Sequence, residues 1–105
     1  MRAAHRNLLR NLVLSAISND YEDIPTITSE VTAWAAEQGL HVTVDEILAT
    51  LTELLQLGHA KAYRFIPPYN LPPEVVCLTQ ITEDNDCYFF ITPDGQFANK
   101  PQPID

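Results

Sequence analysis

The amino-acid sequence predicts a small α+β domain in which three helices are followed by an antiparallel β-hairpin. Three successive segments repeat apolar residues at intervals of three and four, as helices that bury one face do. After Gly58 the apolar pattern changes to alternation, which is typical of strands. A chain of 105 residues has the length of one domain and buries roughly two-thirds of its unfolded surface without metal or disulfide bridges. We therefore expect residues 1–105 to form a single domain.

The first helix is expected over about residues 4–18. Its apolar positions recur at helical spacing and form the predicted buried stripe, which consists of Leu9, Leu12, Val13, Ala16 and Ile17. Leu8 lies at the edge of this stripe, and Leu14 points away from it. The pattern thus predicts an exposed Leu14, either a lone surface leucine or part of a contact with another subunit.

The second helix is expected over about residues 24–38. Residues 19–23 form a polar break, and Asp23 is suited to be an N-cap because proline follows in the first turn. The face predicted to be buried consists of Ile24, Ile27, Val31, Trp34 and Ala35. Gly39 stands where a residue in left-handed conformation ends a helix. Because Pro25 also permits a later start, the first residue of this helix stays open by several positions.

The clearest local signal opens a third helix, expected over about residues 44–57. Thr43-Val44-Asp45-Glu46 has the form of a capping box, in which the hydroxyl and the carboxylate each accept a free backbone N–H. The amphipathic face that follows consists of Val44, Ile47, Leu48, Leu51, Leu54 and Leu55. Gly58 is expected to end this helix.

Two segments beyond Gly58 have the composition of strands. Residues 60–66 place Tyr63 and Phe65 on one face, and residues 87–92 are rich in aromatic and β-branched residues. We expect these two segments to pair as a hairpin.

A proline-rich connection separates the two strands, and the sequence leaves its structure over residues 67–86 open. Within it, residues 74–81 suit either a third strand or a short helix. Pro93-Asp94-Gly95 is expected to end the last strand, and Pro101 and Pro103 exclude a long C-terminal helix.

The charge of the chain argues against non-specific binding of nucleic acid. It carries 14 acidic and 6 basic residues, a formal net charge of -8, which repels a polyanion. No lysine or arginine occurs from Asn11 to Ala60. The one basic stripe, formed by Arg2, Arg6 and Arg10, is suited to touch phosphate or an acidic partner, although contact with solvent alone is the simpler expectation.

No segment is long and apolar enough to span a membrane, so we expect no membrane partner and a cytoplasmic location. A mitochondrial transit helix is the competing interpretation, because the first nineteen residues lack acids and space their arginines four apart. Removal of that segment would, however, also remove the first helix.

The sequence offers neither a catalytic set nor a cofactor or metal site. His5, His41 and His59 are scattered, no serine or cysteine lies in a nucleophile motif, and three glycines exclude a phosphate-binding loop. Cys77 and Cys87 have no histidine at metal-ligand spacing, and we expect them to be buried thiols. The acidic run 83–86 lacks the pattern of a calcium-binding loop and is expected to be a solvated turn.

The aromatic residues of the hairpin are candidates for self-association. Tyr88, Phe89 and Phe90 are consecutive, so a strand must place at least one of them on its outer face. Together with Leu8 and Leu14 they suggest an isologous homodimer, whereas a monomer would cover them with its proline-rich connection. A stacking platform for single-stranded nucleic acid is disfavoured, because such platforms require a basic groove.

Two short passages, together with the order of elements, resemble the winged helix-turn-helix superfamily. Leu55-Gln56-Leu57-Gly58-His59-Ala60 is similar to the passage that leads from the third helix of such domains into the wing. Phe90-Ile91-Thr92-Pro93-Asp94-Gly95 is similar to the passage that closes the wing in PadR-like and MarR-like regulators. The resemblance covers most of residues 4–95 and implies that the third helix enters the major groove of DNA.

The third helix departs from the pattern of a DNA-binding domain. The positions that its spacing leaves exposed are Asp45, Glu46, Ala49, Thr50, Thr52, Glu53 and Gln56. Among these, Thr50, Thr52 and Gln56 are suited to read a base, but no cation accompanies them.

These observations favour a non-catalytic binding module that serves protein–protein contact or self-association in a regulatory context. The alternative is a DNA-binding transcriptional regulator, whose phosphate contacts would come from Arg2, Arg6, Arg10, Lys61 and Arg64. An enzyme is the third and weakest of these hypotheses.

Overall fold

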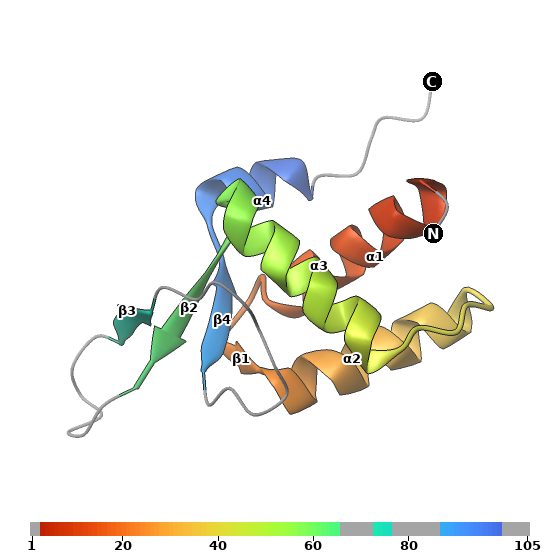
Figure 1. The fold of residues 1–105 in the computed structure, drawn as a ribbon, viewed down its shortest axis with the longest axis horizontal. Helices are drawn as coiled ribbons and strands as arrows, with labels where there is room; N and C mark the ends of the chain where they lie inside the picture. The colour runs from red at the N-terminus through yellow and green to blue at the C-terminus, as the bar shows by residue number, and fades with distance from the viewer. Residues whose placement is uncertain (1–2, 66–72, 77–86, 100–105) are drawn as a thin grey trace.

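The computed structural model describes residues 3–65, 73–76 and 87–99. The elements follow in the order α1 (Ala3–Ala16), β1 (Glu22–Asp23), α2 (Ile24–Glu37), α3 (Val44–Leu57), β2 (Ala60–Arg64), β3 (Glu74–Val76), β4 (Tyr88–Ile91) and α4 (Pro93–Ala98). The first three helices lie together beside the sheet, and α4 follows β4 at the end of the sheet near the C-terminus of α3 (Figure 1). The expected α+β class is confirmed.

The helices predicted from local signals lie close to their expected positions. α3 begins and ends where its capping box and Gly58 place it. Its N-cap is Thr43, whose hydroxyl accepts from the Glu46 N–H (3.2 Å) while the Glu46 carboxylate accepts from the Thr43 N–H (3.0 Å). Gly58 has a left-handed backbone with φ 76°. α2 starts directly after Asp23, whose carboxylate accepts from the Thr26 N–H (3.0 Å).

Two elements were not expected from the sequence, and one ambiguity is resolved. The polar break before α2 contains β1, which exists because Glu22 and Asp23 pair with β4. The segment after β4 does not merely end the strand, since Thr92 caps the short helix α4 by accepting from the Gly95 N–H (3.0 Å). Residues 74–76 form a strand, whereas residues 77–81 lie outside the described ranges.

The sheet has the strand order β1-β4-β2-β3, and every pairing in it is antiparallel. Register aligns Ala60 with Ile91 and Ala62 with Phe89, and all four of these side chains are buried. Since neighbours along a strand point to opposite faces, Lys61, Tyr63, Tyr88 and Phe90 lie on the other face. The helical core therefore rests against one face of the sheet only.

The core is formed by the inner faces of α1, α2 and α3 together with that sheet face. Its fully buried large side chains are Phe89, Leu9, Leu14, Ile17, Ile27, Ile47, Leu51, Leu54, Val13 and Val31. The expected exposure of Leu14 is thus wrong, because its side chain is only 2% exposed. α1 contacts both α2 and α3, and Ile17 at its end accepts a backbone bond from Ile91 (3.1 Å). A helix with neighbours on several sides buries a wider arc than a single amphipathic stripe.

α4 is held tightly against the turn that follows α3. The Thr92 hydroxyl donates to the Gly58 carbonyl (2.7 Å), and the Thr92 N–H donates to the His59 carbonyl (3.0 Å). Gly95 is buried and approaches the same turn so closely that a Cβ there would overlap the His59 carbonyl oxygen and lie 2.8 Å from Ile91 Cγ1. This close approach requires glycine.

Replacing Thr43 by alanine should lower the free energy of unfolding by about 1 kcal/mol, because the N-cap acceptor of α3 is lost. Denaturant titration of the variant measures this change. Thr32→Ala, at an exposed position inside α2, is the matched control and should change stability by less than about 0.5 kcal/mol. An unchanged midpoint for Thr43→Ala would contradict the capping box.

Gly95→Ala should destabilise the fold by roughly 1–3 kcal/mol, because the added methyl group has to displace backbone rather than a flexible side chain. Thermal unfolding of this variant is compared with Gln96→Ala, an exposed position on the same helix. If both variants melt alike, the packing of α4 against the His59 turn is not as described.

Candidate functional site

The outer side of α3, where the sequence placed contacts to DNA or a partner, borders α1 and contains a hollow. The hollow has a volume of about 420 Å³ and is lined by Arg6, Asp45, Glu46, Ala49, Thr50 and Glu53. Arg6 comes from α1 and the remaining residues from α3. The hollow thus combines three carboxylates with one arginine.

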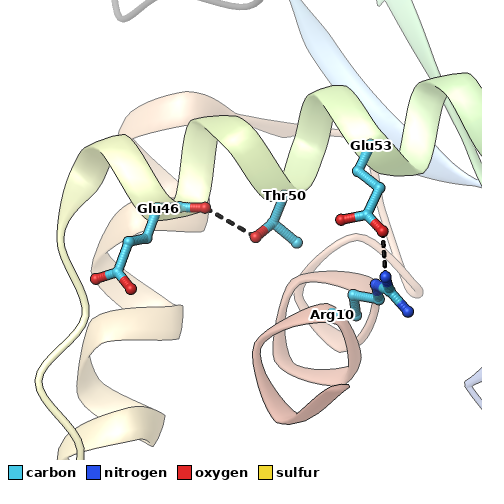
Figure 2. A network of polar contacts seen from close by, with 4 residues as sticks. All are labelled: Arg10, Glu46, Thr50 and Glu53. Atoms are coloured by element: carbon cyan, nitrogen blue, oxygen red, sulfur yellow. Dashed lines mark hydrogen bonds and ion pairs between the residues drawn. The ribbon is translucent and has the colours of Figure 1, made fainter. Parts of the chain in front are cut away.

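Arg10, the other arginine of α1 within the described residues, forms an ion pair with α3. Arg10 donates through Nη2 to Oε1 of Glu53 in an ion pair that joins the two helices (Figure 2). The two side chains are 31% and 33% exposed, so the pair lies at the edge of the helix contact. Part of the predicted basic stripe is therefore neutralised inside the molecule rather than presented to phosphate.

Thr50 and Thr52 are less accessible than the sequence predicted. Thr50 is 6% exposed, and its hydroxyl donates to the Glu46 carbonyl one turn earlier (2.8 Å; Figure 2). Thr52 is half-buried and donates to the Leu48 carbonyl (2.9 Å). Both hydroxyl protons are thus used within α3. Of the three residues proposed to read a base, only Gln56 is exposed.

The titration of Glu46, at the N-terminal end of α3, is shifted by its neighbours. The backbone hydrogen bond from Thr43 holds the pKa of this carboxyl below its usual value, and His5 and His41 lower it further although desolvation opposes the change. Because the pKa of Glu46 is lower in the folded chain than in the unfolded chain, the ionised carboxylate stabilises the fold at pH values above the unfolded pKa, near 4.5. This stabilisation is lost as pH falls through the folded pKa. Glu46 therefore keeps its negative charge at neutral pH.

The histidines that looked scattered in the sequence are partly brought together. His5 lies on α1 and His41 precedes α3, yet both are near enough to Glu46 to affect its titration. The Nε2 atom of His5 is buried without a hydrogen-bond partner. His41 is close to Glu46 along the chain, whereas His5 is brought near it by the packing of α1 on α3.

The remaining predicted cations lie elsewhere. Lys61 and Arg64 are exposed on β2, and within the described ranges neither forms an ion pair. Arg2 lies outside the described residues. The candidate phosphate contacts are therefore divided between α1 and the sheet.

The predicted self-association residues separate into two groups. Leu14 and Phe89 are buried in the core, Phe89 completely, and neither is available to a second molecule. Leu8, Tyr88 and Phe90 are half-buried and keep part of their surface. The outward placement of two of the three consecutive aromatics agrees with the alternation predicted for a strand.

Sequence reasoning missed Tyr21, which lies just before β1. Its ring centroid is 5.0 Å from that of Tyr63, 5.2 Å from Phe65 and 4.9 Å from Phe90. Phe65 also contacts Tyr88 at 5.1 Å. These five half-buried rings form one cluster, which we call the aromatic face and which consists of Tyr21, Tyr63, Phe65, Tyr88 and Phe90. A polar break in the sequence gave no signal for Tyr21, because only the pairing of β1 brings it over the sheet.

A second hollow lies where α2 begins, beside the first residue of α3. Its volume is about 340 Å³, and it is lined by Ile24, Pro25, Thr28, Ser29 and Val44. The side chains around it include no charged group.

Within residues 3–65, 73–76 and 87–99, no three His, Cys, Asp or Glu side chains are grouped so that they could hold a metal ion. Cys87 is a buried free thiol, and Cys77 and the acidic run 83–86 lie outside the described ranges. In the same part of the chain, no helix has both the length and the apolar character needed to cross a bilayer.

Comparisons with protein-family models, curated proteins and solved structures found nothing that matches this chain.

A double-mutant cycle on Arg10→Ala and Glu53→Ala should yield a coupling free energy of roughly 0.2–1 kcal/mol, the range of partly exposed ion pairs. Because salt screens such a pair, the coupling should decrease in concentrated sodium chloride. Denaturant unfolding of the four proteins gives the value. As the control, Arg10→Ala and Glu37→Ala, on separate helices, should be additive. Additivity of Arg10 with Glu53 as well would mean that the pair does not form.

Proposed function

We propose that this chain is a non-catalytic binding module of the winged-helix type that contacts protein rather than nucleic acid. Three helices followed by antiparallel strands agree with the element order of that superfamily. α3 immediately precedes β2, as the resemblance requires of a third helix that leads into a wing. The proposal assigns α3 and its neighbours to a contact surface and assigns no reaction to the chain.

The observation that best supports protein as the partner is the charge of the α3 surface. Asp45, Glu46 and Glu53 surround the hollow, and the lowered pKa of Glu46 keeps that carboxylate ionised. Affinity for DNA comes largely from cations that displace the counterions of the phosphate backbone. A helix that presented these carboxylates to the major groove would add repulsion at each nearby phosphate.

The arginines of α1 do not compensate for the three carboxylates of this surface. Arg10 is paired with Glu53, so its charge is already balanced where a phosphate would have to compete for it. Arg6 alone lines the hollow from α1. An acidic, hollowed surface of this kind is better matched to basic side chains of a protein partner, because complementary charges steer and orient association.

A DNA-binding regulator remains the second candidate, on the specific observation that Lys61 and Arg64 are exposed and, within the described ranges, without ion-pair partners. These two residues lie on β2, in the hairpin that corresponds to the wing under the resemblance. If they supply affinity, binding has to decrease steeply as salt concentration rises.

The test is a fluorescence-anisotropy titration with duplex DNA fragments at low salt. The wild-type chain should show no binding at micromolar concentrations. Asp45→Asn combined with Glu53→Gln removes two carboxylates and releases Arg10, and this variant should gain weak, salt-sensitive binding. Glu30→Gln combined with Glu37→Gln changes the net charge equally on α2 and should gain less. Micromolar or tighter binding by the wild-type chain, abolished by added salt, would overturn the proposal.

A further inference from the structure

The sheet face opposite the helical core carries an apolar surface that has not yet been assigned a role. By strand alternation it displays Tyr63 and Tyr88 side by side, and Val75 aligns with Tyr63 on β3. Val75 is 53% exposed. The rings of the aromatic face contact one another, three of the four pairs edge to face, which is a favoured geometry for aromatic pairs. They remain half-buried rather than buried.

Charges flank the aromatic face with opposite sign on its two sides. On β2, Lys61 is exposed on the same face as Tyr63 and forms no ion pair within the described ranges, whereas alternation places Arg64 on the face of Ala60 and Ala62. On the β1 side, Asp20 precedes Tyr21 and is exposed, and Asp23 aligns with Tyr88 on the face of the rings. β4 runs between β1 and β2, so the negative and the positive side lie on either side of a central strand.

The acidic side consists of carboxylates that repel one another. Burial raises the pKa of the Glu22 carboxyl, and Glu30, Asp20 and Asp23 raise it further. Among the described residues no cation forms an ion pair with any of these four carboxylates. Of these, Asp23 aligns with Tyr88 on the face of the rings, where a cation supplied by a second chain would relieve part of this repulsion.

We propose that a second copy of this chain packs on the aromatic face, as an isologous dimer whose two-fold axis runs along β4. Such an axis superimposes the two sets of rings and brings the β2 side of each copy, with Lys61, opposite the acidic β1 side of the other, with Asp20 and Asp23. The surface is therefore complementary to itself, which is the requirement for an isologous interface. This inference goes beyond the proposed function, because it places a second copy of the chain on the sheet face rather than on the α3 surface.

The same charge arrangement disfavours single-stranded nucleic acid as the occupant of the aromatic face. A stacking platform needs cations along the path of the phosphates. Here Lys61 lies on the β2 side, and the β1 side carries the carboxylates of Asp20 and Asp23. A phosphate backbone that crossed the rings would meet that acidic side.

Sedimentation equilibrium of the full chain at micromolar concentrations should give twice the single-chain mass of 11.8 kDa. Lys61→Glu should weaken the dimer about tenfold, and Asp20→Lys should weaken it similarly, because each homodimer then places like charges opposite each other twice. An equimolar mixture of the two variants should restore association. In the mixed dimer both contacts again join opposite charges. Glu37→Lys, at an exposed position at the end of α2, is the control and should dimerise as the wild-type chain does.

A mass of one chain at all concentrations would overturn the inference, and so would a mixture that stays as weakly associated as its components. Circular dichroism of each variant verifies that folding is unchanged, which is expected because both positions are exposed. Dissociation of the dimer by a single-stranded oligonucleotide would instead indicate nucleic acid on the aromatic face. If the chain is a monomer and does not bind DNA, the dimer inference is wrong but the proposed function is not contradicted. If the wild-type chain binds DNA, the proposed function is contradicted, whether the chain is a monomer or a dimer.

Discussion

The insertion of β4 between β1 and β2 is the constraint on which the rest of this structure depends. Its residue Phe89 is completely buried and aligns with both neighbouring strands. The Ile91 N–H donates to the Ile17 carbonyl at the end of α1, and Thr92 is the N-cap of α4. Because strand residues alternate, the burial of Phe89 and Ile91 forces Tyr88 and Phe90 onto the opposite face. A single strand thus completes the core and creates the aromatic face.

The contact between α1 and α3 determines the electrostatics of the other candidate surface. α1 packs against the side of α3 that carries Thr50, pairs Arg10 with Glu53 and brings His5 near Glu46. The arginines of α1 are therefore positioned toward α3 carboxylates, and an acidic helix is partly neutralised within the molecule. What remains on the surface is predominantly negative, which favours a protein partner over a polyanion.

The features that could be predicted from the sequence are those whose energetics are local. The ends of α3 follow from Thr43, Glu46 and Gly58, since a capping box and a left-handed glycine need only residues within one helical turn. Asp23 and Pro25 define the start of α2 in the same way. Alternation in residues 60–66 indicated one central strand, because the period of two is a property of the extended backbone, and the aromatic and β-branched composition of residues 87–92 indicated the other.

The sequence by itself determined the class of the fold, its three principal helices and its acidic character. Only the tertiary structure decided that Leu14 is buried, that Thr50 is covered and that Tyr21 joins the aromatic face. It also decided that Arg10 is paired with Glu53, forty-three residues away in the chain. These outcomes depend on contacts between segments distant in sequence, and neither helical periodicity nor strand alternation contains information about which faces meet.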